Sequence, residues 1–171
     1  MKLTNTLVVL AMAFGFAACG PDGGQMTAAG GAGAGGTGGR APDAGTMTVA
    51  ARVLGTWRYT AGQMNCTCDD GSVVSDAVDG TETETFSAGL KADQVVATDA
   101  DGCALTCDVY NNTVACHAAT CQYEGARATI SSDVYSLVGN ELNEVSLAEV
   151  AIDGGPTCQC TQTGGVLVRA Q

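Results

Sequence analysis

Nine cysteines dominate the side chains of this sequence that could do chemistry. Four of them form two C-x-C pairs, Cys66/Cys68 and Cys158/Cys160. The i, i+2 spacing places both members of a pair on one face of a strand. A four-thiolate zinc site is one interpretation, but structural zinc sites use C-x₂₋₄-C spacings and reduced thiols. We therefore expect disulfides between the pairs, either in antiparallel order, which joins Cys66 to Cys160, or with the partners exchanged.

Few residues are candidates for catalysis. His117 is the only histidine, so a Ser/His/Asp or Cys/His arrangement cannot be built without it, and oxidised cysteines leave no thiolate nucleophile. Glu82 and Glu84 are two residues apart and could pair as the carboxylates of a glycosidase. A Thr-Glu-Thr-Glu-Thr run is more typical, however, of the solvated face of an edge strand. We expect no enzymatic activity and no cofactor.

The acidic segment 99–102 (Asp-Ala-Asp-Gly) is similar to the start of a calcium-binding loop. An EF-hand loop needs glycine at its sixth position and glutamate at its twelfth. Counted from Asp99, those positions hold Ala104 and Tyr110, so the motif fails. We expect a tight turn here rather than a metal site, with weak calcium binding by the clustered acids as the alternative.

The ninth cysteine, Cys19, follows a short apolar segment, residues 7–14, which Lys2 precedes. The segment 16–19 (Phe-Ala-Ala-Cys) resembles the lipobox of bacterial lipoproteins, apart from its phenylalanine, where that family favours Leu, Val or Ile. The resemblance implies cleavage before Cys19 and attachment of palmitate-type acyl chains to it. Such a lipid anchors the protein to the bacterial cell envelope, at the periplasmic or surface face of the outer membrane. The apolar segment is shorter than the roughly 20 residues of a membrane-spanning helix, and free secretion is the alternative.

Composition divides the chain into three parts. Residues 1–18 are expected to be a signal peptide, residues 19–46 a lipidated cysteine with a Gly- and Ala-rich flexible linker, and residues 47–171 one disulfide-rich β-domain. Without Cys19 the cysteine count is eight, an even number that can pair fully in an oxidising compartment. The net charge of −11 argues against a nucleic-acid partner, which needs clustered Lys and Arg.

The domain sequence is typical of an all-β fold. Alternating polar and apolar residues, rich in Thr, Val and Tyr, are interrupted at short intervals by turn-forming Gly, Asn and Asp, and no amphipathic helix is predicted. The expected strands cover residues 56–61, 81–87, 94–99, 103–110, 113–118, 128–138, 141–152 and 157–169, with a further extended segment at 64–68.

The hairpin around residues 111–112 (Asn-Asn) has the best-determined register. Two residues that tolerate a left-handed backbone, placed between alternating runs, predict a two-residue type I′ turn. Counting back from it, Cys107 faces Cys116 at a non-hydrogen-bonded pair, where side chains approach most closely. We expect a disulfide there, with Cα atoms about 4.4 to 6.8 Å apart. His117 then lies on the opposite, surface side.

Cys103 and Cys121 complete the set of eight. Extended along the same ladder, the register places Cys103 opposite Thr120, one residue short of Cys121. A bulge near residues 118–119 would bring the two cysteines within bonding distance, so we expect a second rung there. Each disulfide should stabilise the domain by a few kcal/mol.

The tripeptide Gly55-Thr56-Trp57 resembles the G-x-W motif of lipocalins and the wider calycin group, and Arg169 matches the arginine that packs across the tryptophan in that family. The resemblance covers only the two ends of the domain. It implies an antiparallel up-and-down meander closed into a lipocalin-like barrel, whose first and last strands are neighbours. A β-sandwich with Trp57 as an ordinary core aromatic is the alternative.

Two functions of different classes are compatible with these features. The first is a membrane-anchored, non-catalytic β-domain that binds a small apolar ligand or a protein partner, and a hollow interior would favour it. The second is a purely structural envelope protein, which a core filled by Trp57, Phe86, Leu105 and disulfides would favour. A secreted enzyme or an enzyme inhibitor is a more distant alternative.

Overall fold

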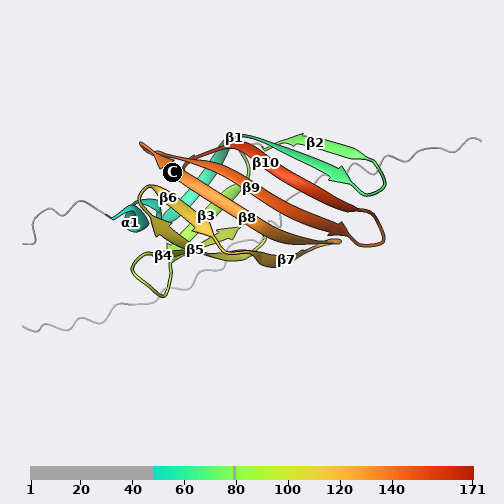
Figure 1. Cartoon of the computed structure of the whole chain (residues 1–171). Coiled ribbons are helices and arrows are strands. Elements are labelled where there is room, and N and C mark those ends of the chain that lie inside the picture. The colour runs from blue at the N-terminus through green and yellow to red at the C-terminus, as the bar shows by residue number, and fades with distance from the viewer. Residues whose placement is uncertain (1–47, 79) are drawn as a thin grey trace, which may run out of the picture. The chain divides into compact units, whose positions relative to one another are not determined.

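The computed structural model describes residues 48–78 and 80–171, which form an antiparallel β-structure (Figure 1). The predicted signal peptide, Cys19 and the linker lie outside the described residues. The elements, in chain order, are α1 (Val49–Val53), β1 (Gly55–Cys68), β2 (Val73–Ala77), β3 (Thr83–Ala88), β4 (Gln94–Asp99), β5 (Ala104–Tyr110), β6 (Thr113–Cys116), β7 (Ala119–Tyr123), β8 (Ala126–Val138), β9 (Glu141–Ile152) and β10 (Thr157–Arg169).

Eight of the strands close into a barrel. Each pairs antiparallel with its neighbours in the order β1-β3-β4-β5-β6-β8-β9-β10, and the pairing of β10 with β1 closes the ring. Because these strands follow one another around the ring in chain order, the fold is an up-and-down meander. The predicted all-β barrel is therefore confirmed, and the β-sandwich alternative is wrong.

Two short strands that the sequence pattern did not predict, β2 and β7, extend the barrel at one end. β2 pairs with the C-terminal half of β1, beyond β3, and β7 pairs with the N-terminal half of β8, beyond β6. β2 and β3 thus follow one edge of β1 as a single interrupted strand, and β6 and β7 do the same along β8. The long strands β1, β8, β9 and β10 carry this extension away from α1 (Figure 1).

The long strands are irregular where the barrel passes into the extension. The pairing register shifts in β1 between residues 59 and 63, in β10 between residues 162 and 165, and in β8 between residues 130 and 132. Such shifts are the signature of β-bulges, which bend a strand and re-aim its side chains. The strand expected to end at Ala61 therefore continues through its bulges to Cys68.

A short helix, α1, which the sequence pattern did not predict, lies at the other end of the barrel (Figure 1). Thr48 caps it, because the threonine side chain accepts a hydrogen bond from Ala51 N at 3.2 Å. Ala50 and Val53 are buried in the barrel core, and Val53 O accepts the indole N–H of Trp57 at 2.7 Å. In the described part of the chain, no helix has the length and apolarity to cross a membrane.

Trp57 and Arg169 meet as the calycin resemblance implies. They are partners in the β1–β10 ladder, Trp57 is 1% exposed, and the guanidinium carbon of Arg169 lies 4.7 Å from the centre of the indole ring. Arg169 also donates to Leu54 O at 2.6 Å and to Arg52 O. Gly55 has a φ of 116°, and a Cβ there would lie 2.8 Å from Arg169 Nη1, so the position requires glycine.

The two C-x-C pairs tie the last strand to the first. Cys66 bonds Cys160 and Cys68 bonds Cys158, with Cα separations of 4.0 and 3.8 Å. This is the antiparallel order of the two alternatives. It follows from the closure of the barrel, since β1 and β10 run antiparallel and place each cysteine directly opposite its partner.

The hairpin register is as expected, but its turn is not. Cys107 faces and bonds Cys116, with a Cα separation of 3.8 Å, which is shorter than the expected range. Among the described residues other than glycine, only Asn111 has a positive φ, of 52°. A type I′ turn needs positive φ at both central residues, so the predicted turn type is wrong.

Cys103 and Cys121 also bond, with a Cα separation of 5.6 Å. The strand expected at 113–118 is shorter than predicted, because β6 ends at Cys116. The chain then continues along β8 as β7, which no longer pairs with β5. The bond therefore joins the turn between β4 and β5 to β7, instead of forming a second rung of the β5–β6 ladder.

Candidate functional site

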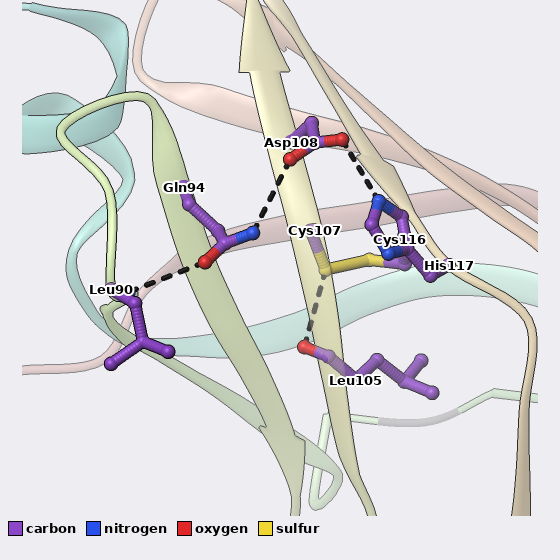
Figure 2. A network of polar contacts seen from close by, with 7 residues as sticks. All are labelled: Leu90, Gln94, Leu105, Cys107, Asp108, Cys116 and His117. Atoms are coloured by element: carbon purple, nitrogen blue, oxygen red, sulfur yellow. Dashed lines mark hydrogen bonds and ion pairs between the residues drawn. A yellow bond between two sulfur atoms is a disulfide. The ribbon is translucent and has the colours of Figure 1, made fainter.

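The only histidine belongs to a polar network on the outer surface of the barrel (Figure 2). His117 Nε2 lies 2.8 Å from Asp108 Oδ2, with the two side chains 58% and 52% exposed, and Gln94 Nε2 donates to Asp108 Oδ1 at 3.4 Å. The hydrogen bond from His117 lowers the pKa of Asp108. The described contacts of this network include no Ser, Thr or Cys nucleophile, so it has the form of a surface ion pair.

The sequence context of Glu84 predicted a solvated face, and this prediction is wrong. The structure places it 7% exposed inside the barrel, on β3, which lies between β1 and β4 rather than at an edge. Glu84 shares its side of the strand with Phe86, which is 2% exposed, because residues two apart face the same way. Glu82 is only partly buried, and the two glutamates do not form a solvent-exposed pair.

Glu84 is one of three carboxylic acids buried in the barrel, which we call the acidic layer: Glu84 on β3, Asp133 on β8 and Glu144 on β9. They are 7%, 4% and 4% exposed. Asp133 and Glu144 were not predicted as site residues. The signal that could have found them is the alternation of strand faces. Asp133 is on the same face of its strand as the buried Leu137, and Glu144 is on the same face as the buried Leu142.

Hydrogen bonds connect Glu144 and Asp133 to donors on three strands of the barrel, β1, β8 and β10. Glu144 Oε2 accepts from the Tyr59 hydroxyl at 2.5 Å and from Gln162 Nε2 at 2.6 Å, while Asp133 Oδ2 accepts from the Tyr135 hydroxyl at 2.9 Å. Asp133 Oδ1 is buried and has no ordinary donor. Glu144 lies on the strand paired with that of Asp133, and the charge of Asp133 raises the pKa of Glu144.

Burial makes these acids weak. Desolvation, followed by the charge of Asp133, raises the pKa of Glu144 from the ordinary 4.5 to about 8. Desolvation likewise raises the pKa of Asp133 from 3.8 to about 6, although the hydrogen bond from Tyr135 opposes the rise. The pKa of Glu84 is raised well above 4.5, first by desolvation and then by the charge of Asp133. Since an unpaired buried charge is unfavourable, burial shifts each of these groups toward its protonated form.

No cationic side chain among the described residues neutralises the charge of the acidic layer. Of the Lys, Arg and His residues in the described part of the chain, none is buried, and none acts on the pKa of the three acids. They are Arg52, Arg58, Lys91, His117, Arg127 and Arg169. The described residues also contain no group of three or more His, Cys, Asp or Glu side chains arranged to hold a metal ion.

The backbone around Glu144 is shaped to its carboxyl. Gly165 is its partner on β10, and a Cβ added at Gly165 would lie 3.0 Å from both Cβ and Oε2 of Glu144. On the other side, Tyr135 is paired with Glu144 across β8 and β9 and meets Phe86 edge to face, with ring centroids 5.1 Å apart. Glycine at position 165 therefore makes room for the acid.

The predicted turn at residues 99–102 lies near the acidic layer. Asp99 Oδ1 accepts from the backbone N–H groups of Asp101 at 3.0 Å and of Cys103 at 2.8 Å. Asp99 Oδ2 accepts from the Tyr123 hydroxyl at 2.8 Å, which connects the turn to β7. The carboxylate is thus used to build the turn, and its charge further raises the pKa of Glu84.

A separate hollow of about 380 Å³ lies on the surface between α1 and the β3–β4 loop. Its lining is mostly small and apolar, and includes Ala51, Leu54, Ala88 and Val95, with Lys91 as a charged member. None of the acidic-layer residues lines it. The hollow can take an apolar group but offers no pair of groups for acid–base chemistry.

Comparisons of the chain with protein-family models, with curated proteins and with solved structures find no match. The filled barrel, its acidic layer and the disulfides are therefore the features on which a function can be based.

Proposed function

We propose that this chain is an exported, lipid-anchored protein of the bacterial envelope whose non-catalytic β-domain acts through its outer surface. The observation that carries the proposal is the filled barrel. Large side chains from opposite walls, among them Trp57, Phe86, Tyr135, Leu142 and Leu167, are at most 2% exposed. A barrel packed in this way favours the structural function over the binding of an apolar ligand in the interior.

Four disulfides are compatible with an exported protein, since they persist in oxidising compartments and are rare in the cytosol. The anchor rests on the lipobox resemblance around Cys19. The proposed partners are the membrane, which the acyl chains bind, and a protein that binds the strongly anionic surface. The surface hollow beside α1 supports a second, lesser candidate, a small apolar ligand bound outside the barrel.

Lipid attachment is tested by labelling cells with a palmitate analogue and separating detergent and aqueous phases. We expect the label and detergent partitioning in the wild type, and loss of both in Cys19→Ser. Phe16→Leu is the matched control, because it restores the residue that the lipoprotein family favours and should keep the label. An unlabelled wild-type protein in the aqueous phase would mean free secretion instead.

Ligand binding is tested by titration with a fluorescent apolar probe. We expect no saturable binding inside the wild-type barrel, and Phe86→Ala, which opens a cavity against Tyr135, is the positive control. Saturable binding that disappears in Ala88→Trp would locate the ligand in the surface hollow. If this substitution leaves saturable binding unchanged, the probe binds inside the barrel, and the proposal of a structural function is overturned.

A further inference from the structure

The acidic layer and the strand irregularities occur at the same level of the barrel. Tyr59 is the last regular residue of β1 before its bulges, and Gln162 and Gly165 flank the bulge in β10. Asp133 comes directly after the bulge in β8, which lies between residues 130 and 132. The groups that bind Glu144 and Asp133 therefore lie beside the register shifts of three long strands, β1, β8 and β10.

The charges that face this layer all have one sign. β1 contributes Tyr59, β8 contributes Tyr135 beside Asp133, and β10 contributes the neutral amide of Gln162. Outside the layer, the acids that raise the pKa of its members are Glu82, just before β3, and Asp99 on β4. The inner residues of the remaining strands do not titrate: Leu105 and Cys107 on β5, Val114 on β6, Leu142 on β9 and Leu167 on β10. Deprotonation thus adds like charges with no cation among the described neighbours to offset them.

We propose that the acidic layer is a proton latch. While the three carboxyls hold their protons, the layer is neutral and the hydrogen bonds of Glu144 with Tyr59 and Gln162 join β9 to β1 and β10. When the protons leave, like charges repel inside the barrel and weaken it.

The direction of the effect follows from linkage. A carboxyl whose pKa is higher in the folded chain than in the unfolded chain binds its proton more tightly when folded. Its stabilising contribution is complete below about pH 4, the pKa of an unfolded carboxyl, and is lost as the pH rises. For Asp133 the loss ends near the folded pKa of about 6, and for Glu144 near about 8. The two acids titrate as a coupled pair, so the transition belongs to the pair.

The latch is tested by measuring the thermal unfolding midpoint of the full chain between about pH 5 and about pH 9. We expect the wild-type midpoint to fall across this range, and Glu144→Gln, which keeps the shape but cannot ionise, to lose at least half of that fall. Glu141→Gln is the matched control, because Glu141 is exposed on the same strand, and it should follow the wild type. An equal fall in Glu144→Gln and the wild type would overturn the latch.

A second measurement uses only the wild type, so it tests the proposal even if Glu144→Gln does not fold. Infrared spectroscopy detects the carbonyl band of a protonated carboxylic acid, which ordinary surface carboxylates have lost at neutral pH. We expect this band to persist at about pH 7 and to weaken as the pH passes about 8, the pKa of Glu144. Absence of the band at about pH 6 would show that the layer is already ionised and would overturn the proposal.

A metal ion is the competing explanation for three buried acids. At about pH 9, where Asp133 and Glu144 are ionised, calcium chloride and potassium chloride of equal ionic strength should raise the unfolding midpoint equally. A rise specific to calcium, lost in Glu144→Gln, would show that the site binds a cation in place of a proton.

Discussion

At the scale of single residues, the interior of this barrel depends on small groups that make room for polar ones. Glu144 can be buried because Tyr59 and Gln162 donate to it and because Gly165 leaves space beside it. Arg169 can cover Trp57 because Gly55 has no side chain. In both places a glycine and a long polar side chain form one unit, and each unit can be tested by a single substitution.

Gly165→Ala should destabilise the fold by about 1 to 3 kcal/mol, the usual cost of overpacking. The new Cβ would lie 3.0 Å from Glu144 Oε2, so the carboxyl must move away from Tyr59 and Gln162. Gly80→Ala is the control, since its Cβ would meet atoms no closer than 3.5 Å. Equal midpoints of denaturant unfolding for the two variants would contradict a tight fit around Glu144.

Arg169→Ala should cost about 1 to 3 kcal/mol, because it removes the cation–π contact with Trp57 and leaves Leu54 O and Arg52 O without their donor. The loss is measured by denaturant unfolding. Arg127→Ala removes the same side chain from an exposed position on β8 and should change stability by less than about 0.5 kcal/mol. If both variants unfold like the wild type, the contact has no role in closing the barrel.

At the scale of elements, the C-x-C pairs make one covalent junction out of two bonds. Cys66–Cys160 spans 94 residues and Cys68–Cys158 spans 90, so both close nearly the same loop between β1 and β10. The entropy that the first bond removes from the unfolded chain is mostly unavailable to the second, which closes only a few further residues. The two rungs should therefore act non-additively.

Removing one rung by Cys66→Ala with Cys160→Ala should cost about 2 kcal/mol or less, while removing all four cysteines should cost a further 4 kcal/mol or so. The free energy of unfolding from denaturant titration measures both losses. Cys107→Ala with Cys116→Ala, which opens a span of 9 residues, is the comparison for a single short loop. A single-rung loss as large as the loss of both rungs would contradict the shared-loop account.

At the scale of the whole molecule, negative charge is both outside and inside. The chain carries a formal net charge of −11, a count that includes the three acids inside the barrel. Burial raises the pKa of each of the three, and that of Glu144, to about 8, keeps this acid largely protonated near neutral pH. A large net charge keeps a protein soluble but strains the compact state through self-repulsion. The domain thus accommodates many acids in two ways: those on the surface are solvated, and those in the core have a raised pKa.

Salt should therefore stabilise the full chain at neutral pH. Raising the ionic strength from about 0.01 M to about 0.1 M shortens the screening length from about 30 Å to about 10 Å, and we expect the thermal unfolding midpoint to rise by several degrees. Near the isoelectric point of about 4.1 the net charge vanishes, and the same change should have little effect. A midpoint that falls with salt at neutral pH would show that attractive ion pairs, not repulsion, dominate the surface.

The sequence by itself determined the features that depend on local alternation. Counting from the turn was enough to place Cys107 opposite Cys116, and the i, i+2 rule was enough to put Cys66 and Cys68 on one face. Gly55, Trp57 and Arg169 pointed to a closed barrel through a resemblance at its two ends. The two cysteine placements succeeded because the pleat of a strand is set by neighbouring residues, whatever the rest of the chain does.

Only the tertiary structure decided which faces were covered. Glu84 lies in an alternating Thr and Glu run that has the same appearance at an edge and at the centre of a sheet, and closure of the ring by β10 and β1 is what buried it. Asp133 and Glu144 are neighbours because β8 and β9 pair directly, but closure of the ring is what buried them, and the order of the C-x-C bonds depended on that closure too. Contacts between distant strands are not contained in local periodicity, because the same pattern satisfies either a solvated or a buried face until its neighbours are known.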